Sequence, residues 1–339
     1  GNMSCSTCHS AWPALNAFGR QFKEHGYRLG HLEAPNKTIS KDLKWDEVLP
    51  ISVLLVARPY DKKDSGEAKN RALHEVELMV AGPMGEKMSG FIELEAEDEE
   101  NFESGIHSAA LTYNHDEAAH IQFSWGNITW FDPYNSYNDH MRMTRGRNSV
   151  VDNEFGGADN AGTIRHARQN MAVYGRPSPK LFYALGFSGD AKDSEGEEGT
   201  SVVDRVAFDV MPTLSVGALA ISGTCDQRGD PGDPCELSDR DYSRNAVDVQ
   251  AEINNFVINS VYMQATDDNA TGTAEEENNA FYLQALYTVR QNGRPTWAPL
   301  IRFDRYEKND GQDEISEVTA SLNYYFTENI RGMLEYWDR

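Results

Sequence analysis

The chain has 339 residues, 39% of them hydrophobic, and its 54 acidic and 31 basic side chains give a formal net charge of -23. This negative charge argues against a nucleic-acid partner, because the phosphate backbone carries the same sign. No segment approaches the roughly 18 consecutive apolar residues of a membrane-spanning helix. A transmembrane β-barrel stays open, because its strands bury only alternate residues in lipid.

The first motif is Cys5-Ser6-Thr7-Cys8-His9. This spacing allows two thiols to add to the haem vinyl groups while the adjacent imidazole reaches the iron. A zinc site needs a second ligand pair nearby, and a thioredoxin-like site needs a strand-helix-strand context; neither is visible in the sequence. The motif therefore predicts one c-type haem, attached through Cys5 and Cys8, with His9 as the proximal iron ligand. Since the chain begins almost at this motif with no signal peptide, we expect a mature, exported protein.

The segment AWPALNAFGRQFKEHGYRLG follows the motif and predicts a short helix. Pro13 suits its first turn and Gly26 suits its end. Leu15, Phe18 and Phe22 fall on one face. That face either packs on a protein core or keeps water away from the porphyrin, and we expect Phe18 and Phe22 to contact the haem.

The sixth ligand of the haem iron is left open by the sequence. His31 lies close enough along the chain to fold back over the haem, and His120 lies on a predicted inward strand face beside Gln122 and Ser124. An open coordination position or a methionine ligand are the alternatives. The other competitors are ten methionines and His25, His74, His107, His115, His140 and His166.

From about Trp45 onward, apolar residues recur at every second position in segments of roughly eight to twelve residues. In one of them, Val247 and Val249 alternate with Asp248 and Gln250. Burying carboxylates inside a soluble sandwich is costly, whereas the wet lumen of a barrel accommodates them. About 14 to 16 such segments predict an all-β fold, a transmembrane antiparallel barrel of about 16 strands in the bacterial outer membrane. The predicted division is a small helical haem plug in residues 1–44 and the barrel in residues 45–339.

Aromatic residues near the predicted strand ends suit girdles at the two lipid interfaces. They are Trp125, Trp130, Trp297, Tyr324, Tyr325, Tyr336 and Trp337. Acidic segments such as EAEDEEN are expected to be solvated loops, and part of their charge could concentrate divalent cations.

The stretch from Trp130 to Pro177 lacks a long alternation and exceeds the length of a simple turn. It carries Arg142, Arg145 and Arg147. Two interpretations stay open. The stretch folds into the barrel mouth as a constriction, with its arginines paired to lumenal carboxylates or haem propionates, or it forms an outer loop with surface arginines.

Cys225 and Cys235 enclose the turn-forming segment DQRGDPGDP. An exported chain matures in an oxidising compartment, and such a loop has no core of its own to hold it. We therefore expect a disulfide between these two cysteines, with two free surface thiols as the alternative.

The N-terminal block resembles the fused monohaem c-type cytochrome-porin family of bacterial outer membranes, known chiefly from iron oxidisers. The resemblance is most specific where CSTCH is followed by Pro13, Leu15, Asn16, Phe18, Gly19, Phe22, Gly26 and Tyr27. It implies a haem plug seated in the barrel and bounded by outer-membrane lipid. It also implies electron transfer from an extracellular donor, Fe(II) in the best-known branch, to a periplasmic c-type cytochrome.

Two other functions remain as alternatives to this electron conduit. One is a passive porin or channel in which the haem segment serves only as a structural plug. The other is a subunit of a larger multihaem conduit that relays electrons to neighbouring chains.

Overall fold

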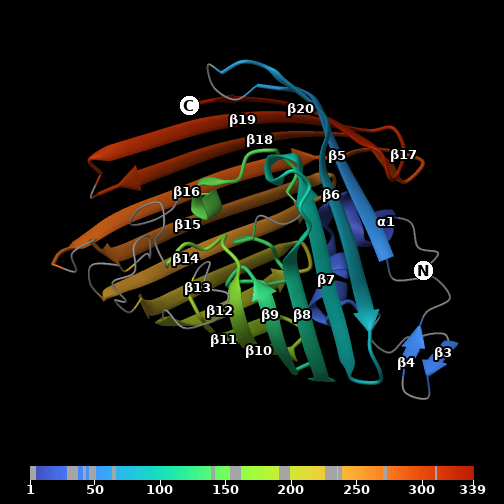
Figure 1. The fold of residues 1–339 in the computed structure, drawn as a ribbon, viewed down its shortest axis with the longest axis horizontal. Coiled ribbons are helices and arrows are strands. Elements are labelled where there is room, and N and C mark those ends of the chain that lie inside the picture. The colour runs from blue at the N-terminus through green and yellow to red at the C-terminus, as the bar shows by residue number, and fades with distance from the viewer. Residues whose placement is uncertain are drawn as a thin grey trace.

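The structure is a computed structural model. It describes residues 5–28, 37–40, 43–45, 51–62, 66–138, 142–152, 162–190, 199–225, 235, 239–269, 273–309 and 311–339. Most of this chain forms one 16-stranded antiparallel sheet. The predicted all-β architecture with about 16 strands is thus confirmed (Figure 1). Within the described residues, no helix is long and apolar enough to cross a membrane.

The strands of the large sheet follow one another in chain order, with β17 pairing to β18 beside the main path. Their bounds are β5 (Ile51–Asp61), β6 (Lys69–Pro83), β7 (Met88–Glu97), β8 (Gly105–Asp116), β9 (Ala119–Gly126), β10 (Arg168–Ser178), β11 (Leu181–Ser188), β12 (Gly199–Met211), β13 (Leu214–Cys225), β14 (Arg240–Ile253), β15 (Phe256–Asp268), β16 (Glu275–Tyr287), β17 (Val289–Gln291), β18 (Arg294–Lys308), β19 (Asp313–Tyr325) and β20 (Arg331–Asp338). A short 3-10 helix, η1 (Asp98–Glu100), follows β7.

The outer face of the sheet is apolar and its inner face is polar. On β14, Val247 and Val249 are 58% and 43% exposed, whereas Asp248 and Gln250 are 3% and 8% exposed. The largest fully buried side chains include Arg168, Arg205, Arg244 and Arg302. This distribution is the reverse of a water-soluble protein, and a barrel surrounded by lipid requires it.

The two ends of the barrel differ in the length of their connections. At one end, residues 212–213 join β12 to β13 and residues 254–255 join β14 to β15. At the other end, residues 226–239 join β13 to β14 and residues 127–167 join β9 to β10. We call these the short-turn end and the long-loop end. In bacterial outer-membrane barrels the short turns lie in the periplasm and the long loops lie outside the cell.

A disulfide joins Cys225 at the end of β13 to Cys235 in the connection to β14, with the two Cα atoms 6.0 Å apart. It closes a short loop at the long-loop end. We predict that replacing both cysteines by serine lowers the free energy of unfolding by roughly 2 to 3 kcal/mol, because the unfolded chain regains the freedom of that loop. Urea titration in lipid vesicles measures this, and an unchanged midpoint would contradict it.

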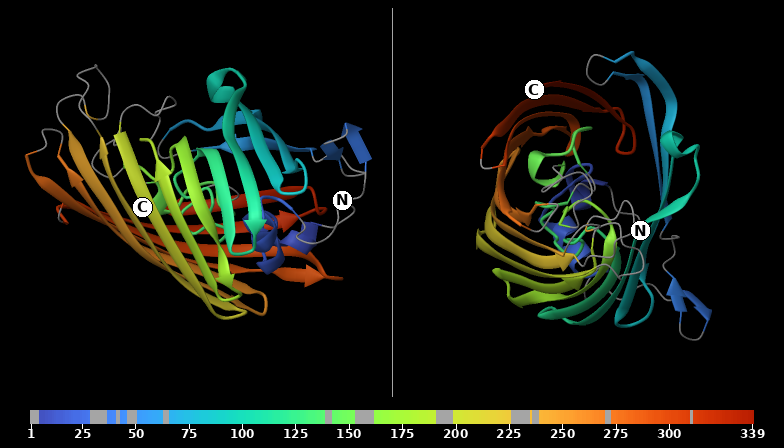
Figure 2. Two further views of the ribbon diagram at one scale, coloured as in Figure 1. Left: turned by 90° about the horizontal axis from the view of Figure 1, so that it is seen from below. Right: turned by 60° about the vertical axis from the view of Figure 1, so that its left-hand side comes forward.

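The N-terminal residues form a compact unit that we call the plug, residues 5–28. It contains α1 (Cys5–Cys8), β1 (His9–Ala11), β2 (Ala14–Leu15) and α2 (Ala17–Glu24). The right-hand view of Figure 2 shows the blue plug inside the space enclosed by the curved sheet. A second two-stranded sheet, β3 (Lys37–Ser40) with β4 (Leu43–Trp45), precedes β5, which begins at Ile51.

The helix predicted from Pro13 begins later, at Ala17. Asn16 sets this start, because its side-chain oxygen accepts a hydrogen bond of 2.9 Å from the amide of Gly19 and so caps the first turn. The residues before Asn16 instead pair as β1 and β2.

The described residues between β9 and β10, which are 127–138, 142–152 and 162–167, fold inward, and we call them the inner loop. Arg302 of β18 donates to Thr144 Oγ1 and to the carbonyl of Arg147, each at 2.8 Å. The amide of Ser149, in the short helix α3 (Ser149–Asp152), donates to Asp304 Oδ1 at 2.7 Å. Of the two interpretations of this stretch, the constriction inside the barrel is correct.

Three aromatic residues predicted for the lipid interface face the lumen instead: Trp130, Tyr325 and Trp337. Trp130 is 4% exposed in the inner loop, and its ring centroid lies 5.2 Å from that of Phe91. Tyr325 faces inward and donates to the carbonyl of Trp12 in the plug at 2.5 Å. The sequence pattern did not distinguish an aromatic girdle from aromatic packing in the lumen.

Arg145 of the inner loop contacts both ends of the strand order, β5 and β20. Its Nη2 lies 2.8 Å from Asp61 Oδ1 on β5, and its amide donates to Glu335 Oε2 on β20 at 2.8 Å. Its guanidinium also lies 5.7 Å from the ring centroid of Trp337. The predicted pairing of this arginine with a lumenal carboxylate is therefore present, and it ties the first and last strands of the sheet together.

Candidate functional site

The haem motif occupies one helical turn at the short-turn end of the barrel. Cys5 and Cys8 begin and end α1, and both are free cysteines that are partly buried. The amide of Cys5 donates to Glu328 Oε2 at 3.3 Å, and its thiol donates to Asn329 Oδ1 at 3.3 Å. Because Glu328 and Asn329 lie in the turn between β19 and β20, the motif rests against the rim of the barrel.

His9 follows α1 directly and its ring is held in one orientation. Its Nδ1 lies 3.0 Å from the carbonyl of Pro13 and donates to it. This bond selects the tautomer whose Nε2 carries the lone pair, which is how outer-shell carbonyls orient metal-binding histidines. Burial lowers the pKa of His9, which favours the neutral ring that an iron ligand must be. Two thiols on one turn and this imidazole fit the donor set of a c-type haem.

Close packing of the two helices holds the motif in place. A Cβ atom added at Gly19 of α2 would lie 2.1 Å from the carbonyl oxygen of Cys8. Only glycine allows this approach. Asn16 reinforces the contact, because its side-chain nitrogen donates to the carbonyl of Thr7 at 3.0 Å.

Several polar contacts attach the plug to the barrel wall. Arg290 of β17 donates to the carbonyl of Ser10 at 2.8 Å. Glu24 pairs with Arg176 of β10 at 2.9 Å, and Arg20 pairs with Glu252 of β14. The contacts reach strands on different sides of the barrel, so the plug is fixed within it rather than suspended from one edge.

Lys23 attaches the plug to the inner loop. Its Nζ donates to the carbonyl of Asp132 and to Asn135 Oδ1, each at 2.8 Å, and lies 5.7 Å from the ring centroid of Trp130. Burial lowers the pKa of Lys23 from 10.5 to about 8. The ammonium form of Lys23 is therefore less favoured in the folded chain than in the unfolded chain.

We predict that the parent protein gains stability relative to Lys23→Met as the pH rises. Below the folded pKa of about 8 the desolvated ammonium costs stability in full. Between this value and 10.5 the folded chain releases a proton that the unfolded chain keeps, so the cost falls as the pH rises. The gain is about 2 kcal/mol at about pH 10. Urea unfolding of both proteins at neutral and alkaline pH measures it, and an equal pH dependence would contradict it.

The two phenylalanines predicted to contact the haem differ in their surroundings. Phe18 is 39% exposed, whereas Phe22 packs edge-on against Tyr27 with ring centroids 5.9 Å apart. Tyr27 has a left-handed backbone with φ of 64°, which costs on the order of 1 kcal/mol in a residue with a side chain. Its ring stacks on Phe91 of β7 at 4.9 Å. The contact of Phe18 and Phe22 with haem stays a prediction.

The two histidines considered for the sixth iron position fare differently. His31 lies outside the described residues. His120 is 2% exposed on the inner face of β9, as its strand pattern indicated. Its Nδ1 bonds Asn114 Oδ1 at 2.9 Å, and its ring lies 5.7 Å from the ring of His25 in the plug.

Among the methionines, Met143 of the inner loop is buried in the same apolar cluster as Ala11, two residues after His9. Ligation by His120 or by methionine stays a prediction.

A group of carboxylates on the inner wall was missed by the sequence reasoning. Glu75 and Glu77 of β6 and Glu95 of β7 offer oxygens that all lie within 4.8 Å of one another. The segment EAEDEEN is therefore not all loop, because Glu95 and Glu97 belong to β7. The alternation of Glu93, Glu95 and Glu97 with apolar neighbours was the signal that could have identified a lumenal face.

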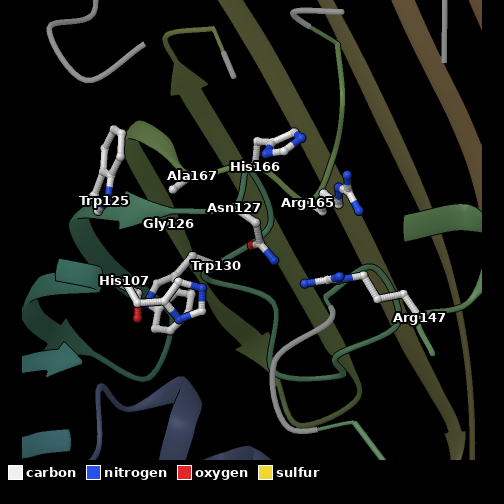
Figure 3. A pocket seen from close by; sticks show the side chains of 10 residues that line it. His107, Trp125, Gly126, Asn127, Trp130, Arg147, Arg165, His166 and Ala167 are labelled. Atoms are coloured by element: carbon white, nitrogen blue, oxygen red, sulfur yellow. The ribbon is translucent and has the colours of Figure 1, made fainter. Parts of the chain in front are cut away.

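A cavity of about 550 Å³ lies between the inner loop and strands β8 and β9, and we call it the Trp130 cavity. Its lining residues come from the long-loop end of these strands and from the inner loop (Figure 3). They include His107, Asn127, Trp130, Arg147 and Arg165.

Comparison with known proteins identifies the fold. No family profile and no curated protein matches the chain. Among solved structures, it is similar to Salmonella typhi OmpF in complex with daunomycin, with 15% identity and a TM-score of 0.56 over 85% of this chain and 87% of that one. An anion-selective porin from Comamonas acidovorans has 14% identity and a TM-score of 0.55 over 82% and 85% of the two chains.

The outer-membrane channel DcaP of Acinetobacter baumannii has 13% identity and a TM-score of 0.52 over 85% of this chain and 87% of that one. At this level of identity the likeness concerns the fold. Together with the apolar outer face, it shows that the chain has the porin-like β-barrel fold of bacterial outer-membrane proteins.

Proposed function

We propose that the protein is an outer-membrane electron conduit. It accepts electrons from an extracellular donor, most simply Fe(II), and delivers them to a periplasmic c-type cytochrome. The observation that carries the proposal is the placement of Cys5 and Cys8 on one turn, with the Pro13-oriented His9 directly after it, inside a porin-like barrel. The motif rests at the short-turn end, which is the periplasmic end in bacterial barrels.

The residues of the plug have separate tasks in this proposal. Cys5 and Cys8 would hold the haem through thioether bonds, and His9 Nε2 would bind its iron. A bound haem supplies a one-electron couple at that site. Tyr325 and Arg290 hold the chain beside His9 through the carbonyls of Trp12 and Ser10. The barrel insulates the site from lipid.

The filling of the lumen supports a conduit over an open pore. The plug, the inner loop and their bonds to several strands occupy the barrel interior. A passive channel with a structural plug is the second candidate, and the likeness to porins and to DcaP favours it. Planar-bilayer recording distinguishes the two, because ohmic current through the intact protein supports the channel and a sealed barrel supports the conduit. Oligomeric state in mild detergent tests the third candidate, a subunit of a multihaem assembly.

Stopped-flow spectroscopy tests the conduit directly. The full-length protein, purified with its haem oxidised, is mixed with excess Fe(II) near neutral pH without oxygen. The proposal predicts a rapid change of the haem absorption bands to those of the reduced form. A haem that stays oxidised would overturn Fe(II) as donor, and a protein isolated with no covalent haem would overturn the conduit itself.

A further inference from the structure

The Trp130 cavity gathers basic side chains in a chain that is otherwise strongly acidic. The whole sequence has 54 acidic against 31 basic side chains. The described residues that line the cavity nevertheless include Arg147, Arg165, His107 and His166, and no aspartate or glutamate. The volume of about 550 Å³ greatly exceeds the ~30 Å³ share of one water molecule and lies in the range of small-molecule sites. The lining and the volume together favour a small organic anion.

The two arginines of the cavity come from separate described segments of the inner loop. Both lie across Asn127 from His107, and the side chain of Arg147 extends toward that of Asn127 (Figure 3). Arg165 pairs with Asp152 at 3.1 Å, and the side chain of Asp152 is 55% exposed. Because a guanidinium presents five N–H donors, Arg165 can pair with this exposed aspartate and bind a ligand carboxylate at the same time.

The opposite end of the cavity, at His107, is less favourable for an anion. The Nδ1 atom of His107 lies 2.9 Å from Glu95 Oε2 and 3.6 Å from Glu93 Oε2. These carboxylates lie behind the ring and do not belong to the cavity lining. They repel a negative charge placed beside His107. The favourable position for an anion is therefore the end formed by Arg147 and Arg165.

The barrel wall fixes the backbone that carries the two arginines. Arg302 of β18 donates to the carbonyl of Arg147 at 2.8 Å. Arg244 of β14 donates to the carbonyl of Gly162, three residues before Arg165, at 3.1 Å. A site whose backbone is held in place before the ligand arrives loses less conformational entropy on binding. The arginine end of the cavity is thus a preformed part of the barrel interior.

Asn127 provides a second and independent observation that points to a ligand. It lines the cavity and is 6% exposed, and its Oδ1 accepts no hydrogen bond within the part of the chain that the structure describes. Buried polar atoms are rarely left in this state unless a water or a ligand completes them. An amide oxygen requires a donor, which an ionised carboxylate lacks. The ligand therefore carries a hydrogen-bond donor in addition to its negative charge.

The donor is better supplied by a hydroxyl group than by an ammonium group. Arg147 extends toward Asn127 (Figure 3), and its guanidinium repels a positive charge placed beside the amide oxygen. A neutral hydroxyl group donates to Asn127 without this repulsion. A ligand with carboxylate and hydroxyl groups on one small skeleton satisfies both ends of the arrangement.

We propose that the Trp130 cavity binds a small hydroxycarboxylate anion, with its carboxylates on Arg147 and Arg165 and its hydroxyl group donating to Asn127 Oδ1. Guanidinium groups suit this ligand because their parallel N–H groups match the two oxygens of a carboxylate. Trp130, which is 4% exposed, supplies an apolar wall for the carbon skeleton. The cavity lies toward the long-loop end, which faces the outside of the cell in bacterial barrels. This binding site goes beyond the electron conduit and does not depend on it.

Isothermal titration calorimetry with citrate as the probe tests the site in the full-length protein in detergent. The buffer is free of metal ions and has constant ionic strength, so that neither a bridging cation nor a change in screening contributes. We expect one citrate bound per chain. Binding should be roughly tenfold to hundredfold weaker in Arg147→Gln and in Arg165→Gln, because each removes a charge-assisted pair with a carboxylate.

The matched control for these variants is Arg305→Gln, at an arginine of β18 that is 46% exposed and lies outside the cavity. It should keep the parental affinity for citrate. A parent protein that does not bind citrate, or an equal affinity in the parent, Arg147→Gln and Arg165→Gln, would overturn the site.

Tricarballylate tests the contact with Asn127, because it has the three carboxylates of citrate and lacks the hydroxyl group. Its binding leaves the buried Asn127 Oδ1 without a donor, so we expect the parent protein to bind it about tenfold more weakly than citrate. In Asn127→Leu no acceptor is left to satisfy, and the preference for citrate should disappear. Equal affinities of the parent for the two anions, or a preference that persists in Asn127→Leu, would contradict the assignment to a hydroxycarboxylate.

Folding of each variant is checked by its shift in electrophoretic mobility on heating, which reports a folded barrel. If Arg147→Gln does not fold, Arg147→Lys replaces it, because lysine keeps the charge and removes the planar fork. A lower citrate affinity in the folded lysine variant supports the site, and an unchanged affinity contradicts it.

These measurements need neither haem nor Fe(II), so their failure is distinct from a failure of the conduit. A protein that carries haem and is reduced by Fe(II), but binds citrate no differently when Arg147, Arg165 or Asn127 is changed, keeps the conduit and loses this anion site. A protein that binds citrate at these residues but carries no haem keeps the anion site and loses the conduit.

Discussion

Replacing Cys5 and Cys8 together by alanine is expected to remove haem that survives denaturation. Both thiols lie on the single turn of α1, and a thioether bond from each would persist after unfolding displaces His9 from the iron. Haem staining of a denaturing gel measures this, and we expect the signal of the parent band to disappear. The single variant Cys8→Ala is expected to keep part of the haem signal, because one thioether bond remains.

The matched control for this loss uses the other cysteine pair. Changing Cys225 and Cys235 to alanine removes the disulfide at the long-loop end, far along the chain from the motif. The haem signal should then stay at the parental level. A parent protein without the stain, or a double Cys5/Cys8 variant that keeps it, would contradict haem attachment at this motif.

Replacing Arg205 by methionine is expected to loosen the Asp132 segment of the inner loop from the wall. Arg205 of β12 is fully buried, with its Nη1 2.8 Å from Asp248 on β14 and its Nε 3.6 Å from Asp132 of the inner loop. Removing the cation leaves two buried carboxylates uncompensated, which costs about 3 to 5 kcal/mol. We expect a lower free energy of unfolding in vesicles and a higher single-channel conductance, because the Asp132 segment loses its ion pair with the wall while Arg302 and Arg145 keep the rest of the inner loop in place.

Two companion variants make this result specific. Arg305→Met removes an arginine that is 46% exposed beside Glu307 and Glu314, and a surface pair of that kind contributes about 1 kcal/mol or less. Asp248→Asn in the Arg205→Met background removes one of the stranded charges and should recover part of the lost stability. Conductance and unfolding equal to those of the parent in Arg205→Met would show that the inner loop does not depend on this pair.

The fold was largely predictable because a membrane barrel obeys a local rule. Each strand alternates lipid-facing and lumen-facing side chains. The sequence around Val247, Asp248 and Val249 therefore predicts which side chains face lipid without knowledge of the other strands. The same rule identified the inward position of His120. It also gave the number of strands closely, since each period-two segment became a strand of the 16-stranded sheet.

The contents of the lumen were less predictable because they depend on contacts distant in sequence. Tryptophan is typical of lipid interfaces, and only the packing of Trp130 on Phe91 shows that this residue lies inside the barrel. Arg145 joins Asp61 to Glu335, residues from the first and last strands of the sheet. No local pattern contains such a contact.

The predicted haem motif also combines features that are local in sequence with features that depend on the fold. Cys5, Cys8 and His9 are close together in sequence, so their spacing alone predicts haem attachment, and that attachment stays a prediction. The bond from His9 to Pro13 and the close approach of Gly19 to Cys8 required the structure. The sixth ligand depends on which side chain the fold brings over the plug, and the sequence offered several.

Electron transfer across a sealed vesicle tests the central claim most directly. The full-length protein is reconstituted in vesicles that enclose oxidised cytochrome c, and Fe(II) is added outside; the double Cys5/Cys8 alanine variant reports any Fe(II) that leaks through the lumen. A protein that conducts electrons through its haem should reduce the enclosed cytochrome, and the double Cys5/Cys8 alanine variant should not. An enclosed cytochrome that stays oxidised, in vesicles whose protein carries haem and spans the membrane, would contradict the conduit.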